Sequence, residues 1–296
     1  MKIQKYAAID IGSNAIRLLI ANVISRPGKP TQFKKSSLVR APIRLGSDVF
    51  LHSKISDENK SRMIKAIQAF SLLMQVYNVE NFKACATSAM REAKNGKAVA
   101  DAIFKETGVK IDIINGKTEA LIISSTDIKN YIDENKNYLY VDVGGGSTEF
   151  NIYKKGKIAN SRSFPIGTVR ILDNMVTEKV WLDAENWIIN QTKNLDKLSL
   201  IGSGGNINKI HKMSGKKLDA PLSYIYLNAQ YHYLNNLSYE DRISELNLNP
   251  DRADVIIPAL KIYLLAMKWS NARNIYVPKI GLADGIIKSL YAGNLT

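Results

Sequence analysis

The hydrophobic and polar positions of this chain switch repeatedly between two patterns. Short apolar runs such as residues 5–12 (KYAAIDIG) and 109–116 (VKIDIING) are typical of buried strands. Residues 55–79 instead repeat their apolar side chains every three or four positions, which predicts an amphipathic helix with Ser56 as its N-cap. The same two patterns predict a strand at 81–89, helices at 97–108 and 117–132, and one long apolar helix at 250–269.

The pattern of the N-terminus then starts again. Residues 7–23 (AAIDIGSNAIRLLIANV) match residues 139–155 (LYVDVGGGSTEFNIYKK) in outline, so that Asp10 aligns with Asp142 at an offset of 132 residues. A repeat of this length is typical of two related domains rather than of a solenoid. We expect an α/β fold with a mixed sheet and helices in each half, and a ligand site in the cleft between the halves.

Composition and charge narrow the classes of function. The 296 residues are 45% hydrophobic, and 41 Lys plus Arg against 27 Asp plus Glu give a formal charge of +14. This excess favours a polyanionic partner, either nucleic acid or a phosphate-rich substrate, although it also serves solubility alone. The basic residues are dispersed, so charge does not choose between these partners.

Few features of the sequence bear on the cellular location of the protein or on its redox chemistry. The single cysteine, Cys85, excludes a disulfide within the chain and is expected to be a small buried hydrophobe. The N-terminus lacks a signal-peptide pattern, and the apolar stretch 255–267 is too short to span a bilayer. We therefore expect a cytoplasmic protein with no membrane association.

Three glycine-rich turns follow strand-like runs, at residues 10–14 (DIGSN), 142–148 (DVGGGST) and 202–206 (GSGGN). Consecutive backbone N–H groups in such turns form a concavity that binds phosphate, and glycine allows its close approach. The third turn also opens a helix, whose N-terminus favours anions. One such turn is weak evidence, but three of them, two with a matched leading aspartate, predict phosphate binding.

Carboxylates accompany these turns. Asp10 and Asp142 each end a strand, and Glu149 lies seven residues beyond Asp142. Mg²⁺ prefers one or two carboxylates together with phosphate oxygens and water. The alternative for each aspartate is a local hydrogen bond within the turn.

Glu119 and Arg91 are two further candidates. Glu119 falls in the first turn of a predicted helix, where it serves either the helix dipole or catalysis as a base for water. Arg91 follows a strand and suits bidentate phosphate contact, although a solvated surface arginine is the simpler interpretation. The three histidines show no metal-ligand spacing.

Eight segments of the chain, taken together and in order, resemble the Ppx/GppA phosphatases. They are residues 7–23, 86–95 (ATSAMREAKN), 113–122 (IINGKTEALI), 140–150 (YVDVGGGSTEF), 163–171 (SFPIGTVRI), 201–210 (IGSGGNINKI), 251–260 (DRADVIIPAL) and 281–287 (GLADGII). The resemblance runs from about residue 6 to the C-terminus. It implies two ribonuclease-H-like domains of the actin/hexokinase/heat-shock superfamily that flank a central cleft. We place them at residues 1–124 and 125–283, with a C-terminal helix at about 284–296 packing back on the first.

The resemblance also implies an activity and roles for residues. The activity is removal of the terminal phosphoryl group from a chain of phosphoanhydrides, with Mg²⁺. Glu119 matches the general base, Asp142 the metal-associated aspartate and Glu149 its acidic partner, assigned to both metal and catalysis. The phosphate-binding residues are expected to be Asp10, Ser13, Asn14, Arg91, Gly144, Gly145, Gly146, Ser147, Gly204, Gly205 and Asn206.

The sequence departs from the family pattern in two places. The C-terminal helical domain with an HD metal motif, present in longer members, has no counterpart here, so the chain resembles a short-form member. Ala283 stands where the family often has arginine.

These observations predict an exopolyphosphatase that acts on linear polyphosphate. The alternatives are a guanosine pentaphosphate phosphohydrolase, a small-molecule kinase of the same superfamily and a non-catalytic sensor that binds (p)ppGpp. No nucleic acid polymer is expected as a partner, and homodimer formation is left open.

Overall fold

The computed structural model describes residues 1–126, 128 and 131–295. The chain divides into two compact units, Met1–Thr126 with Gly281–Thr296 (unit 1) and Asp127–Ile280 (unit 2). Unit 1 therefore consists of the N-terminal part of the chain and a C-terminal segment that returns to it. The boundaries expected from the sequence were 124/125 and 283/284.

Unit 1 is built on a five-stranded mixed sheet in the order β3-β2-β1-β4-β5. The first three strands are antiparallel to one another. β1 and β2 pair in continuous register from Lys2↔Ser25 to Ile11↔Ile16, and β3 pairs with β2. β4 and β5 then add in parallel to β1. The strands are β1 (Lys2–Ile11), β2 (Ile16–Arg26), β3 (Lys29–Ala41), β4 (Asn81–Ala86) and β5 (Ile111–Ile113).

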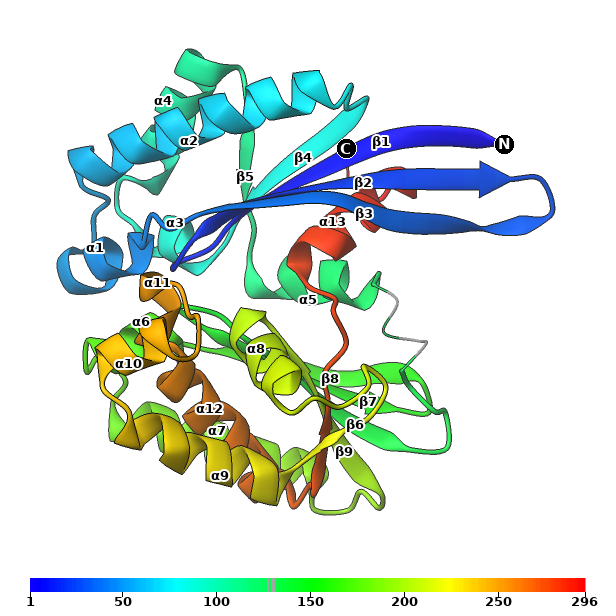
Figure 1. Cartoon of the computed structure of the whole chain (residues 1–296), viewed down its shortest axis with the longest axis vertical. Helices are drawn as coiled ribbons and strands as arrows, with labels where there is room; N and C mark the ends of the chain where they lie inside the picture. Colours follow the sequence, from blue (N-terminus) through cyan, green and yellow to red (C-terminus); the bar gives the residue numbers. More distant parts are fainter. Residues whose placement is uncertain (127, 129–130, 296) are drawn as a thin grey trace. The chain divides into compact units, whose positions relative to one another are not determined.

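Helices cover both faces of this sheet (Figure 1). α2 and α4 lie on one face and α5 and α13 on the other, where Tyr291 of α13 meets the ring of Tyr6 at 5.7 Å. The Ser56 hydroxyl accepts a hydrogen bond from the Asn59 N–H, which confirms the predicted N-cap of α2. The helices are α1 (Leu45–His52), α2 (Asp57–Val76), α3 (Ser88–Glu92), α4 (Gly96–Thr107), α5 (Gly116–Ser124) and α13 (Leu282–Tyr291).

Unit 2 repeats this plan with a six-stranded sheet in the order β10-β11-β9-β6-β7-β8. β6, β7 and β8 form an antiparallel meander, β9 is parallel to β6, and β11 is parallel to β9. The strands are β6 (Asn137–Val143), β7 (Thr148–Lys154), β8 (Lys157–Phe164), β9 (Leu198–Ser203), β10 (Leu222–Ser223) and β11 (Asn274–Tyr276).

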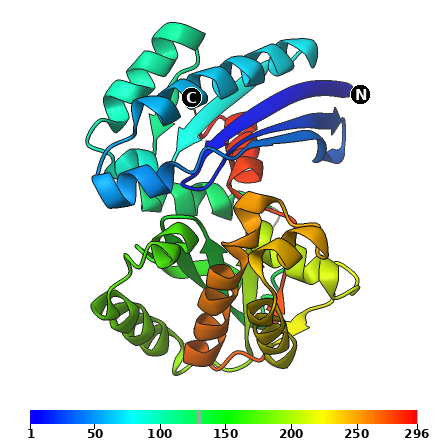
Figure 2. The same cartoon turned by 60° about the vertical axis from the view of Figure 1, so that its left-hand side comes forward.

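The core of unit 2 forms between its sheet and helix α12, in which ten of fifteen residues are buried. Figure 2 shows α12 alongside the strands of unit 2. A helix that is apolar on most of its circumference needs neighbours on several sides, and α12 packs against α6, α7, α8 and α9. The helices are α6 (Thr168–Leu172), α7 (Glu178–Thr192), α8 (Gly205–Met213), α9 (Tyr224–Asn236), α10 (Tyr239–Ser244), α11 (Pro250–Ala253) and α12 (Ile256–Ser270).

The structure differs from the sequence expectations at several elements. The strand predicted at 81–89 ends at Ala86, and helix α3 begins at Ser88. The edge strand β3 was not predicted, because its burial pattern is mostly exposed and lacks an apolar face. The helix predicted at 117–132 ends at Ser124, where the Ser124 and Ser125 hydroxyls donate to the Leu121 carbonyl; residues 127, 129 and 130 of that prediction lie outside the described residues. The long helix predicted at 250–269 is two helices, since Pro258 has no N–H and belongs in the first turn of α12.

Two smaller expectations concern burial and membranes. Cys85 is fully buried on β4, as predicted for a small hydrophobe. Among the described residues, no helix combines the length and the apolar character needed to cross a bilayer. The cytoplasmic location stays a prediction.

Candidate active site

The carboxyl edge of the sheet in unit 1 gathers the first group of predicted site residues. The parallel strands β1, β4 and β5 end at Ile11, Ala86 and Ile113, so the segments that follow them lie at one edge. In open α/β sheets, ligands bind outside this edge. The three segments carry Ser13 and Asn14, then Arg91, then Glu119.

The turn between β1 and β2 is held by backbone hydrogen bonds. Gly12 N–H donates to the Ala15 carbonyl at 3.1 Å, which closes the turn, and Ser13 is 3% exposed. The backbone N–H of Arg44 donates to the Asn14 carbonyl at 3.0 Å, and the segment at the start of α1 thus fixes the turn from outside.

Asp10 lies directly opposite Arg17 across β1 and β2. The Asp10 Oδ2 accepts a hydrogen bond from the Arg17 Nη1 at 2.8 Å, and the carboxylate is buried while the guanidinium is partly exposed. The negative charge of Asp10 therefore has a cation within its own hairpin, which weakens its case as a metal ligand.

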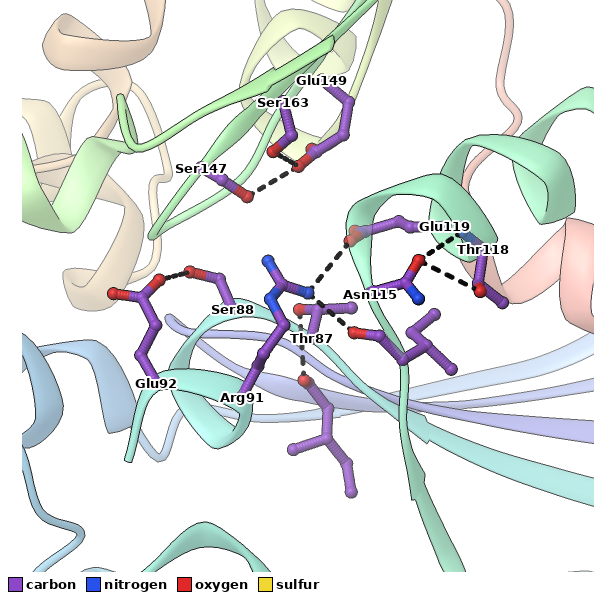
Figure 3. Close-up of polar contacts among 12 residues, drawn as sticks. Thr87, Ser88, Arg91, Glu92, Asn115, Thr118, Glu119, Ser147, Glu149 and Ser163 are labelled. Carbon is purple, nitrogen blue, oxygen red and sulfur yellow. Dashed lines mark hydrogen bonds and ion pairs between the residues drawn. The ribbon is translucent and has the colours of Figure 1, made fainter. Parts of the chain in front are cut away.

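Glu119 is buried in the first turn of α5, at 7% exposure. Asn115 caps this helix by accepting the Thr118 N–H at 2.9 Å, and the Glu119 N–H donates to the Asn115 carbonyl (Figure 3). The Arg91 Nη1 lies 3.9 Å from the Glu119 Oε2, beyond hydrogen-bond distance, and donates instead to the Ile114 carbonyl at 2.7 Å.

This arrangement can orient a water molecule and a phosphate. A buried carboxylate that is positioned by its helix is a candidate general base. The Arg91 side chain is anchored at one nitrogen and is still 28% exposed, so it retains donors that a phosphate reaches. The structure therefore brings Glu119 and Arg91 together in unit 1.

The glycine turn of unit 2 repeats the turn of unit 1 at the same offset. Gly144 N–H donates to the Ser147 carbonyl at 2.9 Å, which is the hydrogen bond of Gly12 and Ala15 moved by 132 residues. The strand register repeats as well, with Asp142 opposite Glu149. The internal repeat predicted from the sequence is thus present in the backbone.

The start of α6 fixes this second turn by backbone and side-chain hydrogen bonds. The Thr168 and Val169 N–H groups donate to the carbonyls of Gly144 and Gly145, at 3.0 and 2.9 Å, and the Arg170 Nε donates to the Gly146 carbonyl at 2.7 Å. A Cβ at Gly167 would lie 2.2 Å from the Gly145 carbonyl oxygen, so only glycine permits this approach. Arg170 lies within segment 163–171, which carries the family resemblance, but no role was predicted for it.

Two carboxylates share one face of unit 2, because directly opposed residues of antiparallel strands point to the same side. Glu149 is 3% exposed and accepts hydrogen bonds from the hydroxyls of Ser147 at 2.7 Å and Ser163 at 2.8 Å (Figure 3). Like charges directly opposite one another are destabilising unless a cation or a proton compensates them.

This pair fits the donor chemistry of Mg²⁺, which needs one or two protein carboxylates when substrate and water supply the other oxygens. No cluster of three or more His, Cys, Asp or Glu side chains suited to a metal occurs in the described part of the chain. The fit is therefore to a cation that substrate oxygens help to hold.

The pKa of the buried Tyr263 hydroxyl is raised well above its usual value by burial and by the Asp142 charge.

The third glycine turn joins β9 to α8 in unit 2. β9 pairs in parallel with β6 through Asp142↔Ser203, so this turn follows the same sheet edge as Gly144–Ser147. The Tyr263 hydroxyl donates to the Ser203 carbonyl just before the turn. Arg252 lies beside the turn, since a Cβ at Gly205 would be 3.2 Å from its Nη2.

The predicted residues thus fall into one group in each unit. Unit 1 carries Asp10, Ser13, Asn14, Arg91 and Glu119; unit 2 carries Asp142, Gly144, Gly145, Gly146, Ser147, Glu149, Gly204, Gly205 and Asn206. Sequence reasoning missed Arg17, Ser163 and Arg170. Arg17 had a usable signal, because it lies seven residues after Asp10 as Glu149 does after Asp142.

Two α/β units with matched strand–glycine-turn–strand hairpins define a protein of the ribonuclease-H-like class. Within that class, residues 33–292 match the Ppx/GppA phosphatase family, and the chain belongs to this family. It is similar over 98% of both chains to the crystal structure of an exopolyphosphatase from Cytophaga hutchinsonii, with a TM-score of 0.81 and 22% identity. A Ppx/GppA family member from Aquifex aeolicus matches over the full length of both chains, with a TM-score of 0.77 and 23% identity.

Curated relatives carry different names. A bifunctional 3-dehydroquinate synthase/phosphatase from Fusobacterium nucleatum is 30% identical over 85% of this chain, which spans 41% of that relative's length. A putative exopolyphosphatase from Haemophilus influenzae is 24% identical over 97% of this chain and 92% of its own. A guanosine-5'-triphosphate,3'-diphosphate pyrophosphatase from Photobacterium profundum is 24% identical over 95% of this chain and 58% of its own.

Proposed function

We propose that this protein is an exopolyphosphatase, which hydrolyses the terminal phosphoanhydride of linear polyphosphate and releases orthophosphate. The observation that carries the proposal is Glu119, a buried carboxylate fixed in the first turn of α5 with the Arg91 guanidinium 3.9 Å away. A base for water and a phosphate-binding cation are the two functions that hydrolysis of a phosphoanhydride requires from side chains.

In the proposed reaction, Glu119 orients a water molecule toward the terminal phosphorus and accepts its proton. The hydrogen bond from Arg91 to the Ile114 carbonyl holds the guanidinium in place, and its other donors bind oxygens of the terminal phosphate. The backbone N–H groups of the glycine turns bind further phosphate oxygens. The water oxygen forms a bond to the terminal phosphorus, and the bridging phosphorus–oxygen bond breaks. The shortened chain leaves with the negative charge on its new terminal oxygen.

Asp142 and Glu149 would hold the Mg²⁺ ion. The ion would neutralise negative charge on the phosphate oxygens. The hydroxyls of Ser147 and Ser163 fix the orientation of the Glu149 carboxylate, which is the contribution that the protein makes to this site.

The formal charge of +14 supports a polyanionic substrate, because a polyphosphate chain is attracted to a basic protein. Guanosine pentaphosphate is the second candidate substrate, since relatives of both names match nearly the whole chain. Side-by-side kinetics on the two substrates separates them. We place the activity in the cytoplasm. The one cysteine is a buried free thiol, so the fold does not depend on the oxidising environment in which disulfides form.

The test of the proposal is Glu119→Gln, which keeps the size of the side chain and removes the base. We expect release of orthophosphate from polyphosphate with Mg²⁺ to fall by about 10²–10⁴-fold. The matched control is Glu106→Gln at an exposed position of α4, with an expected change below about twofold. Full activity of a folded Glu119→Gln variant would refute the assignment of the base.

A further inference from the structure

Unit 2 contains a cavity that none of the roles above uses. Its volume is about 670 Å³, within the range of roughly 300–1,000 Å³ that is typical of ligand pockets. The walls come from the end of α7, the loop that leads into β9, the end of α12 and the loop that leads into β11. It therefore lies within one unit.

The cavity lies at the opposite end of the sheet from the glycine turns. Its lining includes the first residues of β9 and β11, Leu198 and Asn274, whereas the turns follow the last residues of β6 and β9. A strand of six or seven residues is about 20 Å long, so the two ends are separate places on unit 2. A ligand in this cavity is thus distinct from a substrate at the glycine turns.

The lining is strongly basic. Four cations, Lys136, Lys193, Lys197 and Arg273, line the cavity together with a single carboxylate, Asp196, for a formal charge of +3. Lys136 has an ion pair with Asp133 at 3.5 Å, but among the described residues no ion pair involves Lys193, Lys197 or Arg273. The C-terminal ends of α7 and α12 contribute roughly half a negative charge each, which offsets only part of this excess.

Aromatic rings complete the lining. Trp269 and Tyr276 both face the cavity, and Trp269 is supported from behind by Trp181, with ring centroids 6.2 Å apart. A planar base stacks on such rings, whereas an inorganic phosphate chain uses the cations alone. The excess of positive charge therefore favours an anionic ligand. The rings determine whether a ligand that also carries a nucleobase binds more tightly than a phosphate chain alone.

We propose that this cavity is a binding site for an oligophosphate chain, supplied as free inorganic oligophosphate or as the phosphate tail of a nucleotide. Lys193, Lys197 and Arg273 bind the phosphate oxygens, and a chain with three or more negative charges matches the formal charge of +3. The proposal does not depend on the hydrolytic activity of the protein.

The test uses the ¹⁵N-labelled full chain in the presence of a chelator, so that no hydrolysis occurs. Inorganic tripolyphosphate is titrated in one series and ATP in another, and amide resonances are followed residue by residue. We expect saturable shifts at residues 193–199 and 271–274 in both series. An additional shift of the Trp269 indole N–H with ATP alone would identify the nucleotide as the better source.

The decisive variant is Lys193→Ala/Lys197→Ala/Arg273→Ala, all three at exposed positions. Its affinity at residues 193–199 and 271–274 should fall at least about tenfold, while shifts at Gly144–Ser147 keep their midpoint. The matched control removes the same three charges elsewhere in unit 2, at the exposed Lys155, Lys157 and Lys179, and should keep both midpoints. Absence of saturable shifts at the cavity, or an equal loss of affinity in both triple variants, would overturn the proposal.

Discussion

The hairpins β1–β2 and β6–β7 share a backbone and differ in charge. Each is closed by the same hydrogen bond, from Gly12 to Ala15 in unit 1 and from Gly144 to Ser147 in unit 2. Each places an aspartate opposite the residue seven positions later. That residue is a cation in unit 1, where Arg17 contacts Asp10 at 2.8 Å, and an anion in unit 2, where Glu149 lies opposite Asp142.

The difference shows how one duplicated turn serves two purposes. In unit 1 the hairpin carries its own counter-ion, so a phosphate at the turn meets little net charge from the pair Asp10 and Arg17. In unit 2 the two opposed carboxylates suit a cation, and the hydroxyls of Ser147 and Ser163 hold one of them in place. If the proposed function holds, the backbone of both turns binds phosphate, and we expect the metal in unit 2 alone.

Among variants of the two turns, the largest effect is expected where the second turn is most tightly enclosed, at Gly167. A Cβ there would lie 2.2 Å from the Gly145 carbonyl oxygen, so Gly167→Ala displaces backbone of the turn itself. We expect kcat/KM for phosphate release to fall by about 100-fold and stability by about 1–3 kcal/mol, measured by steady-state kinetics and thermal unfolding.

The comparison variant in unit 1 is Gly12→Ala, which alters the first turn at the counterpart of Gly144. A Cβ at Gly12 would lie 3.3 Å from the Ala15 carbonyl oxygen, which a small adjustment accommodates. Its activity should fall only a few-fold. Equal losses in the two variants would show that the turns are equally constrained and would remove this difference between the units.

A smaller effect on activity is expected at Arg170. The Asn14 carbonyl of unit 1 accepts a backbone N–H from Arg44, whereas its counterpart, the Gly146 carbonyl, accepts the Arg170 side chain. Arg170→Met keeps most of the volume and removes the Nε donor. The expected loss is about 1.5–3 kcal/mol in stability and roughly tenfold in kcat/KM.

The control for Arg170 is Arg44→Met, because the hydrogen bond that Arg44 makes to the first turn comes from its backbone and survives the substitution. Activity within about threefold of the unsubstituted protein is expected. A larger loss at Arg44 than at Arg170 would mean that the side chain of Arg44 contributes to the site in its own right.

The smallest effect is expected at Cys85. Cys85 of β4 lies beside Asp10 of β1 in the sheet, and Ser203 of β9 lies beside Asp142 of β6 in the same way. Burial, and next the Asp112 charge, raise the pKa of the Cys85 thiol from 9.0 to about 12. The folded protein should therefore keep the thiol protonated, and a thiol-specific reagent at pH 8 should modify it only after unfolding.

The same shift in pKa has a consequence for stability. Between pH 9 and about 12 the unfolded chain ionises Cys85 and the folded chain does not, so stability falls with rising pH across this window. Cys85→Ser, which introduces the residue of unit 2, should remove this contribution and change activity less than about twofold. Rapid modification of the native protein would contradict the predicted burial of the thiol.

The duplicated hairpins were predictable because glycine turns and strand patterns are local. The offset between Asp10 and Asp142 is visible in the sequence, and the structure reproduces it in hydrogen bonds and register. The edge strand β3 was not predictable, because its residues alternate only weakly and it depends on pairing with β2.

Side chains that act on a distant backbone were equally hidden. Arg170 reaches Gly146 across 24 residues, and Ser163 reaches Glu149 from the neighbouring strand β8. Neither contact follows from spacing or residue type, because an arginine and a serine are common at exposed positions. The charge of Arg17 was readable, but its meaning depended on the strand register that places it opposite Asp10.

The most direct test of the difference between the hairpins is binding of Mn²⁺, a paramagnetic substitute for Mg²⁺, in the presence of orthophosphate, followed by electron paramagnetic resonance. The unsubstituted protein should bind one ion at the pair Asp142 and Glu149, Glu149→Gln should weaken binding at least about tenfold, and Asp10→Asn should leave it unchanged. Binding that survives Glu149→Gln, or that is lost equally in Asp10→Asn, would contradict the assignment of the metal to unit 2.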